Sequence, residues 1–300
     1  MQYKEAQGAR VPEIGLGTYR LYGRECEETV RKALDIGYRH IDTAQMYKNE
    51  KEIGDAVYNS SIDREDLFIT TKIWHTNLEH DDVLQSVEDS LRMLKSPYVD
   101  LLLVHWPTEH FSIDGTFKAM LTLRDQGKAL NVGVSNFPLK LMQEVVEEHR
   151  LPILTNQVEF HPFLDQFDLL EYSYDHDFLI TAYSPLAQGE ALRNEKLYEI
   201  AEEYGKTPAQ IALRWLIEQE NVVAIPKASS EQHLKDNIEI FDFTLSDEHF
   251  EAIDQRFEDQ NAKFAARFEQ LDKRFKQLVA LMSVFFGVLA GLIGALSLFG

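Results

Sequence analysis

The feature that most constrains the fold is a regular alternation of short apolar runs with amphipathic helical patterns. Eight runs are predicted as strands, at 38–43, 67–73, 99–106, 131–136, 156–160, 178–184, 222–227 and 240–243. Helical patterns lie between them, at 27–36, 82–94, 117–126, 139–149 and 208–218. Parallel strands joined by helices are covered on both faces, which explains the continuously apolar runs. Eight such units predict an α/β fold, a closed (β/α)8 TIM barrel.

An open doubly wound sheet is the alternative arrangement of such units. That fold would need a glycine-rich turn directly after its first strand, whereas the sequence there reads HIDTAQMYKNE. Before this strand, Gln7 and Gly8 lie between Tyr3 and Val11. This spacing predicts an N-terminal β-hairpin that closes the bottom of the barrel.

The pattern changes after residue 254, where apolar residues recur in alternating steps of four and three. The stripe consists of Phe257, Asn261, Phe264, Phe268, Leu271, Phe275 and Leu278. It predicts a coiled-coil helix over 255–277, in which Asn261 at a core position would specify a homo-oligomer. A helix that packs its phenylalanines on the barrel is the alternative. Residues 278–300 are uncharged and long enough for a transmembrane helix. We therefore expect three parts: a barrel over 1–254, the coiled coil and the membrane span.

Charge and cysteine content exclude several classes of function. The formal net charge is −20. Segment 255–277 has six basic and four acidic residues, so the rest of the chain carries a net charge still more negative than that of the whole. An acidic surface repels nucleic acid, and no nucleic-acid partner is predicted. The single cysteine, Cys26, excludes a disulfide framework and multi-thiolate zinc sites, and no metal is predicted. The N-terminus carries no apolar leader. Basic residues at 273–276 precede the predicted span, which predicts a single-pass C-terminal membrane anchor with the catalytic domain in the cytoplasm.

Four polar residues fall at the carboxyl ends of three successive predicted strands, where a barrel gathers its active site. Tyr47 can act as the general acid that protonates a carbonyl oxygen during reduction, provided that Lys72 lowers its pKa. Asp42 can keep Lys72 charged and oriented, and His105 can donate a hydrogen bond to the same oxygen. Their joint placement predicts a catalytic tetrad for carbonyl reduction.

A set of motifs from about residue 3 to about residue 254 resembles the aldo-keto reductases. The stretches are GLGTYRL at 15–21, GYRHIDTAQMYKNE at 37–50, TTKIW at 70–74, VDLLLVHWP at 99–107, GVSNF at 133–137, NQVEFHP at 156–162, AYSPLAQG at 182–189 and IPKAS at 225–229. Within the family, the chain is most similar to the bacterial 2,5-diketo-D-gluconate and methylglyoxal reductases.

The resemblance implies a nicotinamide cofactor and the residues that would bind it. The implied cofactor contacts are Ser135, Asn136, Gln157, Tyr183, Ser184, Leu186, Gln188, Lys227, Ser229, His233, Asp236 and Asn237, with Tyr183 stacked on the nicotinamide. Tyr19, Trp74 and Trp106 would wall the substrate pocket. His233 stands where many NADPH-preferring relatives have arginine, so we expect NADPH with weaker discrimination against NADH.

The resulting functional hypothesis is NAD(P)H-dependent reduction of small aldehydes or ketones, such as oxoaldehydes and diketo sugar acids, at a membrane. In relatives a C-terminal segment folds over the barrel mouth. Here the predicted coiled coil and membrane span replace that segment, which implies a more open substrate pocket or one covered by a neighbouring protomer. The alternative hypothesis is a nucleotide-sensing regulatory or scaffold subunit of a membrane complex, and the intact tetrad disfavours it.

Overall fold

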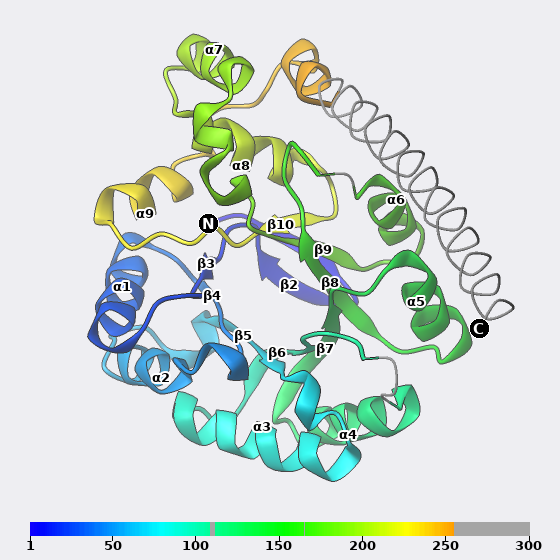
Figure 1. Ribbon diagram of the computed structural model, residues 1–300. Helices are drawn as coiled ribbons and strands as arrows, with labels where there is room; N and C mark the ends of the chain where they lie inside the picture. Colours follow the sequence, from blue (N-terminus) through cyan, green and yellow to red (C-terminus); the bar gives the residue numbers. More distant parts are fainter. Residues whose placement is uncertain (109–111, 165, 255–300) are drawn as a thin grey trace, which may run out of the picture. The chain divides into compact units, whose positions relative to one another are not determined.

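The computed structural model describes residues 1–108, 112–164 and 166–254 (Figure 1). Residues 1–253 form one compact unit. The predicted coiled coil at 255–277 and the predicted span at 278–300 lie outside the described residues.

Eight parallel strands pair in chain order around the molecule (Figure 1). They are β3 (Leu16–Gly17), β4 (His40–Asp42), β5 (Phe68–Ile73), β6 (Val99–Val104), β7 (Ala129–Ser135), β8 (Ile153–Glu159), β9 (Leu179–Tyr183) and β10 (Val222–Ala224). The residues directly before β3 pair with the last strand, β10: Gly15 N donates to the Ala224 oxygen at 2.9 Å, and Ala224 N donates to the Glu13 oxygen at 2.8 Å. These bonds close the sheet, and the predicted (β/α)8 arrangement is confirmed.

Helices follow the strands and surround the barrel. They are α1 (Gly23–Ile36), α2 (Glu50–Tyr58), α3 (His80–Leu94), α4 (Ile113–Asp125), α5 (Leu139–Gln143) with the π-helical η4 (Glu144–Glu148), α6 (Phe167–Asp175), α7 (Glu195–Tyr204), α8 (Pro208–Glu218) and α9 (Glu231–Ile238). Short 3-10 turns are η1 (Gln45–Tyr47), η2 (Arg64–Asp66), η3 (His75–Asn77), η5 (Ala187–Gly189) and η6 (Ala191–Arg193). The largest apolar cluster fills the layer between strands and helices, which accounts for the apolar face of each helix.

The predicted hairpin is present at the bottom of the barrel. Strands β1 (Tyr3–Ala6) and β2 (Ala9–Pro12) pair antiparallel, and Gln7 and Gly8 take positive φ values of 50° and 76° in the turn between them. The buried side chains of Ala6 and Val11 share an apolar cluster with residues near the amino ends of the barrel strands, such as Phe68 and Leu179. The hairpin therefore plugs the end opposite the strand carboxyl ends.

Two strand assignments are corrected by the structure. Residues 240–243 form no strand; the backbone oxygens of Glu239 and Ile240 instead accept hydrogen bonds from side chains of α8, namely Gln210 and Arg214. The eighth barrel strand is β3, near the start of the chain. With only two residues, β3 is too short to carry a period-2 pattern, whereas the apolar run at 240–243 imitates one.

The predicted membrane localisation is also corrected. No helix in the described ranges, 1–108, 112–164 and 166–254, is long and apolar enough to cross a bilayer. The prediction of a single-pass anchor with a cytoplasmic catalytic domain is therefore wrong; it depends only on segments 255–277 and 278–300, which lie outside the described residues.

Candidate active site

The four residues of the predicted tetrad meet at the carboxyl ends of adjacent strands. Asp42 ends β4 and Lys72 lies one residue before the end of β5, while His105 directly follows β6. Tyr47 ends the turn η1 that follows β4. Because β4, β5 and β6 are neighbours in the barrel, their ends bring these side chains to one rim.

Lys72 and Asp42 form a buried ion pair at the centre of this rim. The Lys72 Nζ lies 2.5 Å from Asp42 Oδ1, and the two side chains are 0% and 2% exposed. The ammonium also donates to the Thr43 backbone oxygen at 2.9 Å and to the Tyr47 hydroxyl at 3.4 Å. Burial acts to lower the pKa of Lys72, but the attraction of Asp42 and Tyr47 outweighs it, and the net pKa is raised. The lysine is therefore held fully protonated.

Tyr47 keeps its proton more firmly than the sequence predicts. We expected Lys72 to lower the Tyr47 pKa, yet that pKa is raised. The largest cause is burial, which disfavours the phenolate; the Lys72 charge opposes burial without overcoming it. The phenol is consequently in the protonated form that a general acid requires.

His105 is a neutral imidazole beside Tyr47. Burial, with smaller contributions from Lys72 and His75, lowers the pKa of His105 to about 3. Its ring centroid lies 5.6 Å from that of Tyr47 and 5.2 Å from that of Trp74. The Nδ1 atom is buried and has no hydrogen-bond partner within the described part of the chain. A neutral ring has a single N–H, so it can serve as one donor without bringing a charge.

The loops around the tetrad are fastened by buried amides. Asn49 donates to the backbone oxygens of Thr18 and Leu21 at 2.9 and 3.0 Å, which ties the loop carrying Tyr19 to the one carrying Tyr47. Gln45 accepts from the backbone N–H of Trp74 at 3.0 Å and so fixes Trp74 beside His105. The aromatic walls are thus held by specific hydrogen bonds.

Four residues predicted to contact the nicotinamide form one hydrogen-bonded group. Tyr183 donates to Asn136 Oδ1 at 2.9 Å, and the Asn136 amide donates to the Ser135 hydroxyl at 3.0 Å. The Ser135 hydroxyl donates to the Gln157 backbone oxygen at 2.8 Å. Gln157 and Asn136 also bond to the tetrad side of the site, through Asp42 and the His105 backbone oxygen.

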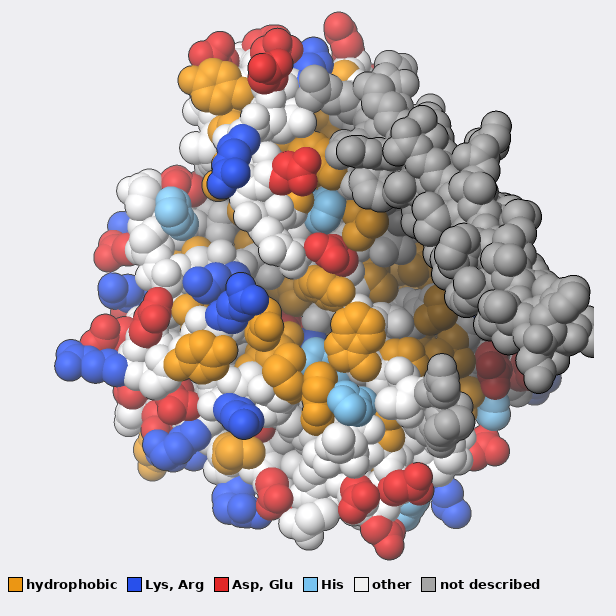
Figure 2. All heavy atoms as spheres, viewed as in Figure 1, with side chains coloured by type: hydrophobic (Ala, Val, Ile, Leu, Met, Phe, Trp, Pro, Cys, Tyr) orange, Lys and Arg blue, Asp and Glu red, His pale blue; other side chains and the backbone are white. Residues whose placement is uncertain are grey.

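A cavity of about 900 Å³ opens over this rim. Figure 2 shows the face hollowed near its centre, with hydrophobic side chains gathered around the hollow. The predicted residues that line it are Tyr19, Asp42, Tyr47, His105, Trp106, Ser135, Asn136, Gln157, Tyr183, Ser184, Leu186, Gln188, Lys227, His233, Asp236 and Asn237. Three predicted residues are not among the lining: Lys72, whose side chain is fully buried, Trp74, which packs on His105, and Ser229.

Several lining residues were missed by the sequence analysis. They are Gly17, Thr18, Arg20, Met46, Glu159, Pro185, Gly189, Leu192, Thr207, Ala209, Ile225 and Pro226. Some could have been found, because Arg20 directly follows Tyr19 and Glu159 lies within NQVEFHP. Leu192 and Thr207 had no local signal; the connection from β9 to α8 brings them to the cavity.

The far end of the cavity offers cationic and polar groups suited to a phosphorylated ligand. Lys227 and His233 are exposed there, beside the start of α9, where Ser230 caps the helix by accepting from the His233 N–H at 3.2 Å. Helix N-termini favour anions. The volume lies at the upper end of the range of about 300–1,000 Å³ typical of small-molecule sites. An extended dinucleotide reaching from the tetrad to α9 fits this set of residues.

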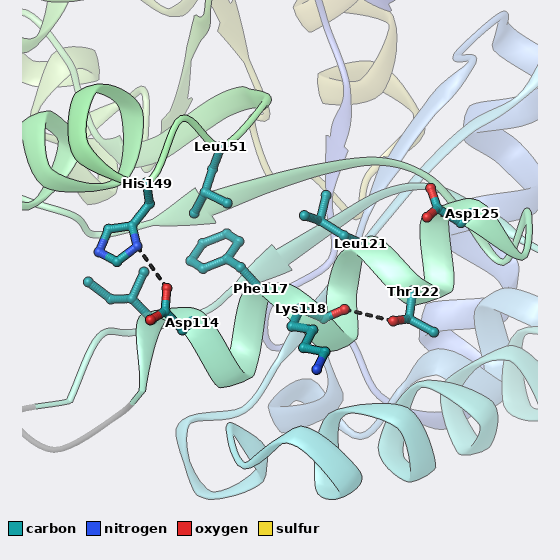
Figure 3. Close-up of a pocket in the computed structure, with 9 residues that line it drawn as sticks. Asp114, Phe117, Lys118, Leu121, Thr122, Asp125, His149 and Leu151 are labelled. Carbon is teal, nitrogen blue, oxygen red and sulfur yellow. Dashed lines mark hydrogen bonds and ion pairs between the residues drawn. The ribbon is translucent and has the colours of Figure 1, made fainter.

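A second, smaller cavity of about 330 Å³ lies outside the barrel, beside α4 (Figure 3). Phe117, Leu121 and Leu151 line it, and His149 Nδ1 lies 2.9 Å from Asp114 Oδ1 at one side. No predicted site residue lies there. Among the described residues there is also no cluster of three or more His, Cys, Asp or Glu side chains that could hold a metal. The barrel mouth is therefore the candidate active site.

Comparisons with known proteins identify the family to which the chain is similar. The model of the aldo/keto reductase family matches residues 13–258. The chain is 41% identical to a glyoxal reductase of Bacillus subtilis over 254 residues, covering 84% of this chain and 91% of the relative. It is 37% identical to a methylglyoxal reductase of Escherichia coli over 247 residues, covering 81% and 88%. A crystal structure of the aldo-keto reductase MGS-M4, from a deep-sea metagenome library of the Medee basin, superposes with a TM-score of 0.81 at 38% identity, covering 85% and 94%.

These matches give the predicted membrane anchor no support, because the family match ends at residue 258 and the relatives are named as reductases. They agree instead with the barrel fold. The chain belongs to the aldo-keto reductase family, whose members reduce carbonyl compounds with a nicotinamide cofactor.

Proposed function

We propose that this protein reduces small aldehydes and ketones with NADPH, and that oxoaldehydes such as glyoxal and methylglyoxal are its preferred class of substrate. One observation carries the proposal: a fully buried lysine, neutralised by Asp42, reaches the hydroxyl of a protonated tyrosine at the mouth of the barrel. An ion pair with only a structural role would not require a tyrosine hydroxyl that faces a cavity, so this arrangement favours a catalytic role.

Each tetrad residue has a distinct task in this proposal. Tyr47 donates its phenolic proton to the carbonyl oxygen as negative charge develops there, and Lys72 stabilises the phenolate that remains. Asp42 keeps Lys72 charged and in place. His105, neutral at physiological pH, donates its single N–H to the same oxygen. The cofactor supplies the hydride when it is bound.

NADPH is favoured over NADH by the charge at the far end of the cavity. Lys227 can pair with a 2′-phosphate, and the start of α9 adds a favourable dipole. His233 contributes less than an arginine, because an imidazole cannot make the bidentate contact that a guanidinium makes with a phosphate. We therefore expect a preference for NADPH that is modest in size. Ser135, Asn136, Gln157 and Tyr183 are proposed to orient the nicotinamide.

The substrate class follows from the walls of the cavity and from the relatives. Tyr19 and Trp106 line the mouth and are 46% and 44% exposed, so a small carbonyl compound can contact aromatic surface beside Tyr47. The Tyr19 ring lies 5.1 Å from the Tyr47 ring, centroid to centroid. The matched relatives include a glyoxal reductase and a methylglyoxal reductase.

The test is NADPH oxidation by the full chain with glyoxal, methylglyoxal, a diketo sugar acid and a long-chain aldehyde. Removing the phenolic proton with Tyr47→Phe should lower kcat by about 10² or more, because positioned acid catalysis contributes about 10²–10⁴. NADPH affinity should stay nearly unchanged. Tyr58→Phe, at a 71% exposed position on α2, is the matched control. Turnover that survives in Tyr47→Phe would remove Tyr47 from the role of acid.

A further inference from the structure

Gln157 occupies a position between the cofactor side of the cavity and the tetrad. We propose that Gln157 is a positioning residue of the catalytic ion pair: its side-chain amide holds the Asp42 carboxylate, which in turn holds Lys72 beneath Tyr47. This inference rests on the proposed function, and it adds a second task to a residue otherwise expected only to bind the nicotinamide.

The contact itself is short and buried. Gln157 Nε2 donates to Asp42 Oδ2 at 2.7 Å, and both residues are 2% exposed. Because an ionised carboxylate only accepts hydrogen bonds, the amide group that faces it is the nitrogen. Asp42 therefore has one oxygen on Lys72 and the other on Gln157. Each carboxylate oxygen is engaged by a different donor, which fixes the plane of the carboxyl group.

The two residues come from opposite sides of the barrel. Asp42 ends β4 and Gln157 lies in β8, four strands away in a ring of eight. They are 115 residues apart in the sequence. The hydrogen bond consequently crosses the mouth and ties the tetrad strands to the strands that carry the cofactor contacts.

Gln157 is itself held in place by neighbouring strands. Its backbone oxygen accepts from the Ser135 hydroxyl at 2.8 Å, and Ser135 accepts from Asn136. Asn136 also donates to the His105 backbone oxygen at 3.0 Å, a second link between the two halves of the site. The amide oxygen of Gln157 makes no hydrogen bond within the described residues, so it remains available to a ligand in the cavity.

Loss of the Gln157 amide would leave one buried oxygen of Asp42 without a donor. A buried acceptor without a partner is costly, and rotation of the carboxyl group to find another donor would move its other oxygen off Lys72. Lys72 would then lose the charge partner that holds it beneath Tyr47. The chemical step should suffer even when the cofactor is saturating, and this separates positioning from simple cofactor binding.

The experiment is a double-mutant cycle on the full chain with Gln157→Met and Asp42→Ala, in which kcat is measured at saturating NADPH and methylglyoxal. NADPH affinity is measured in parallel by protein fluorescence. We expect Gln157→Met to lower kcat about tenfold in the parent protein and less than twofold in the Asp42→Ala background. Gln188→Met lines the same cavity without contacting Asp42, and it should change kcat by the same factor in both backgrounds.

Equal losses from Gln157→Met in both backgrounds, or a loss confined to NADPH affinity, would overturn the proposal. The same four proteins are also unfolded in urea without ligand, where the contact predicts coupling between the two substitutions. If the parent protein reduces none of the carbonyl compounds, the proposed function fails on its own. The unfolding cycle then decides whether Gln157 holds Asp42, with additive effects counting against it.

Discussion

Lys72 uses all three protons of its ammonium group, on Asp42, Thr43 and Tyr47, and is completely buried. Replacement by Met should destabilise the protein by about 3–5 kcal/mol, because it leaves the Asp42 carboxylate buried without its counter-charge. Since the Lys72 pKa is raised, the stabilisation is fully present below about pH 10 and is lost as pH rises through that pKa.

Urea unfolding at pH 7 measures this loss, and NADPH oxidation should show that turnover disappears with it. Lys51→Met is the matched control, because Lys51 forms an ion pair with Asp55 on the exposed face of α2 and should have little effect. A Lys72→Met protein as stable as the parent would mean that Asp42 is solvated or protonated in the fold.

His105 makes stability depend on acid pH. Its pKa is about 3 in the folded protein, chiefly because of burial, and about 6.5 in an unfolded chain. Between these values the unfolded chain binds a proton that the folded protein does not, so stability falls as pH falls from about 6.5, by up to about 1.4 kcal/mol per pH unit. His105→Gln should flatten this slope in urea unfolding between pH 4 and pH 7.

His40 and His161, each with a pKa lowered to about 4 mainly by burial, keep part of the slope in that variant. Parallel slopes in the parent and the His105→Gln protein would show that His105 is solvated in the fold.

The sequence predicts which residues lie together in the tetrad but not how their pKa values are shifted. Asp42, Tyr47, Lys72 and His105 could be found because strand ends converge in a barrel. The direction of the Tyr47 pKa could not, since it depends on how deeply the packed loops bury the phenol. The hydrogen bond from Gln157 to Asp42 could not be predicted either, because it joins residues from strands on opposite sides of the barrel.

At the scale of elements, α2 and α3 pack closely at Gly54. A Cβ atom added there would meet the Met93 backbone oxygen at 2.4 Å and the Leu94 backbone carbon at 2.6 Å. Alanine favours a helix by about 1 kcal/mol over glycine, yet Gly54→Ala should destabilise the protein by about 1–3 kcal/mol because backbone atoms must move.

Urea unfolding tests this, with Gly115→Ala in α4 as the control. There the added Cβ would meet only the Ser112 side chain, at 3.1 Å, so a small effect is expected. If Gly54→Ala raised stability by its gain in helix propensity, the close approach of the two helices would be wrong.

Elements were predictable from the sequence where they were long and periodic. Strands β5 and β6 are six buried residues each and were predicted to within two residues at either end. The two-residue β3 gave no pattern, and its place in the sheet is set by backbone bonds to β4 and β10. The strand prediction at 240–243 was wrong for the opposite reason: the sequence has a strand-like apolar pattern there, but these residues pack against α8 and pair with no strand.

At the scale of the whole molecule, every residue that lines the active-site cavity lies between Gly17 and Asn237. The compact unit ends at Ile253, and the family match ends at residue 258. A chain of residues 1–258 should therefore keep kcat and the KM for methylglyoxal within about twofold of the full chain, because tetrad, cofactor contacts and aromatic walls are all retained. Both proteins are assayed side by side in the same detergent-containing buffer, so that solubility does not enter the comparison. If residues 259–300 contributed to substrate choice, their removal would change the KM values unequally across small and long-chain aldehydes. Unchanged ratios of kcat/KM across the panel would place the whole of specificity within the barrel, whereas a selective change would assign part of it to the C-terminal residues.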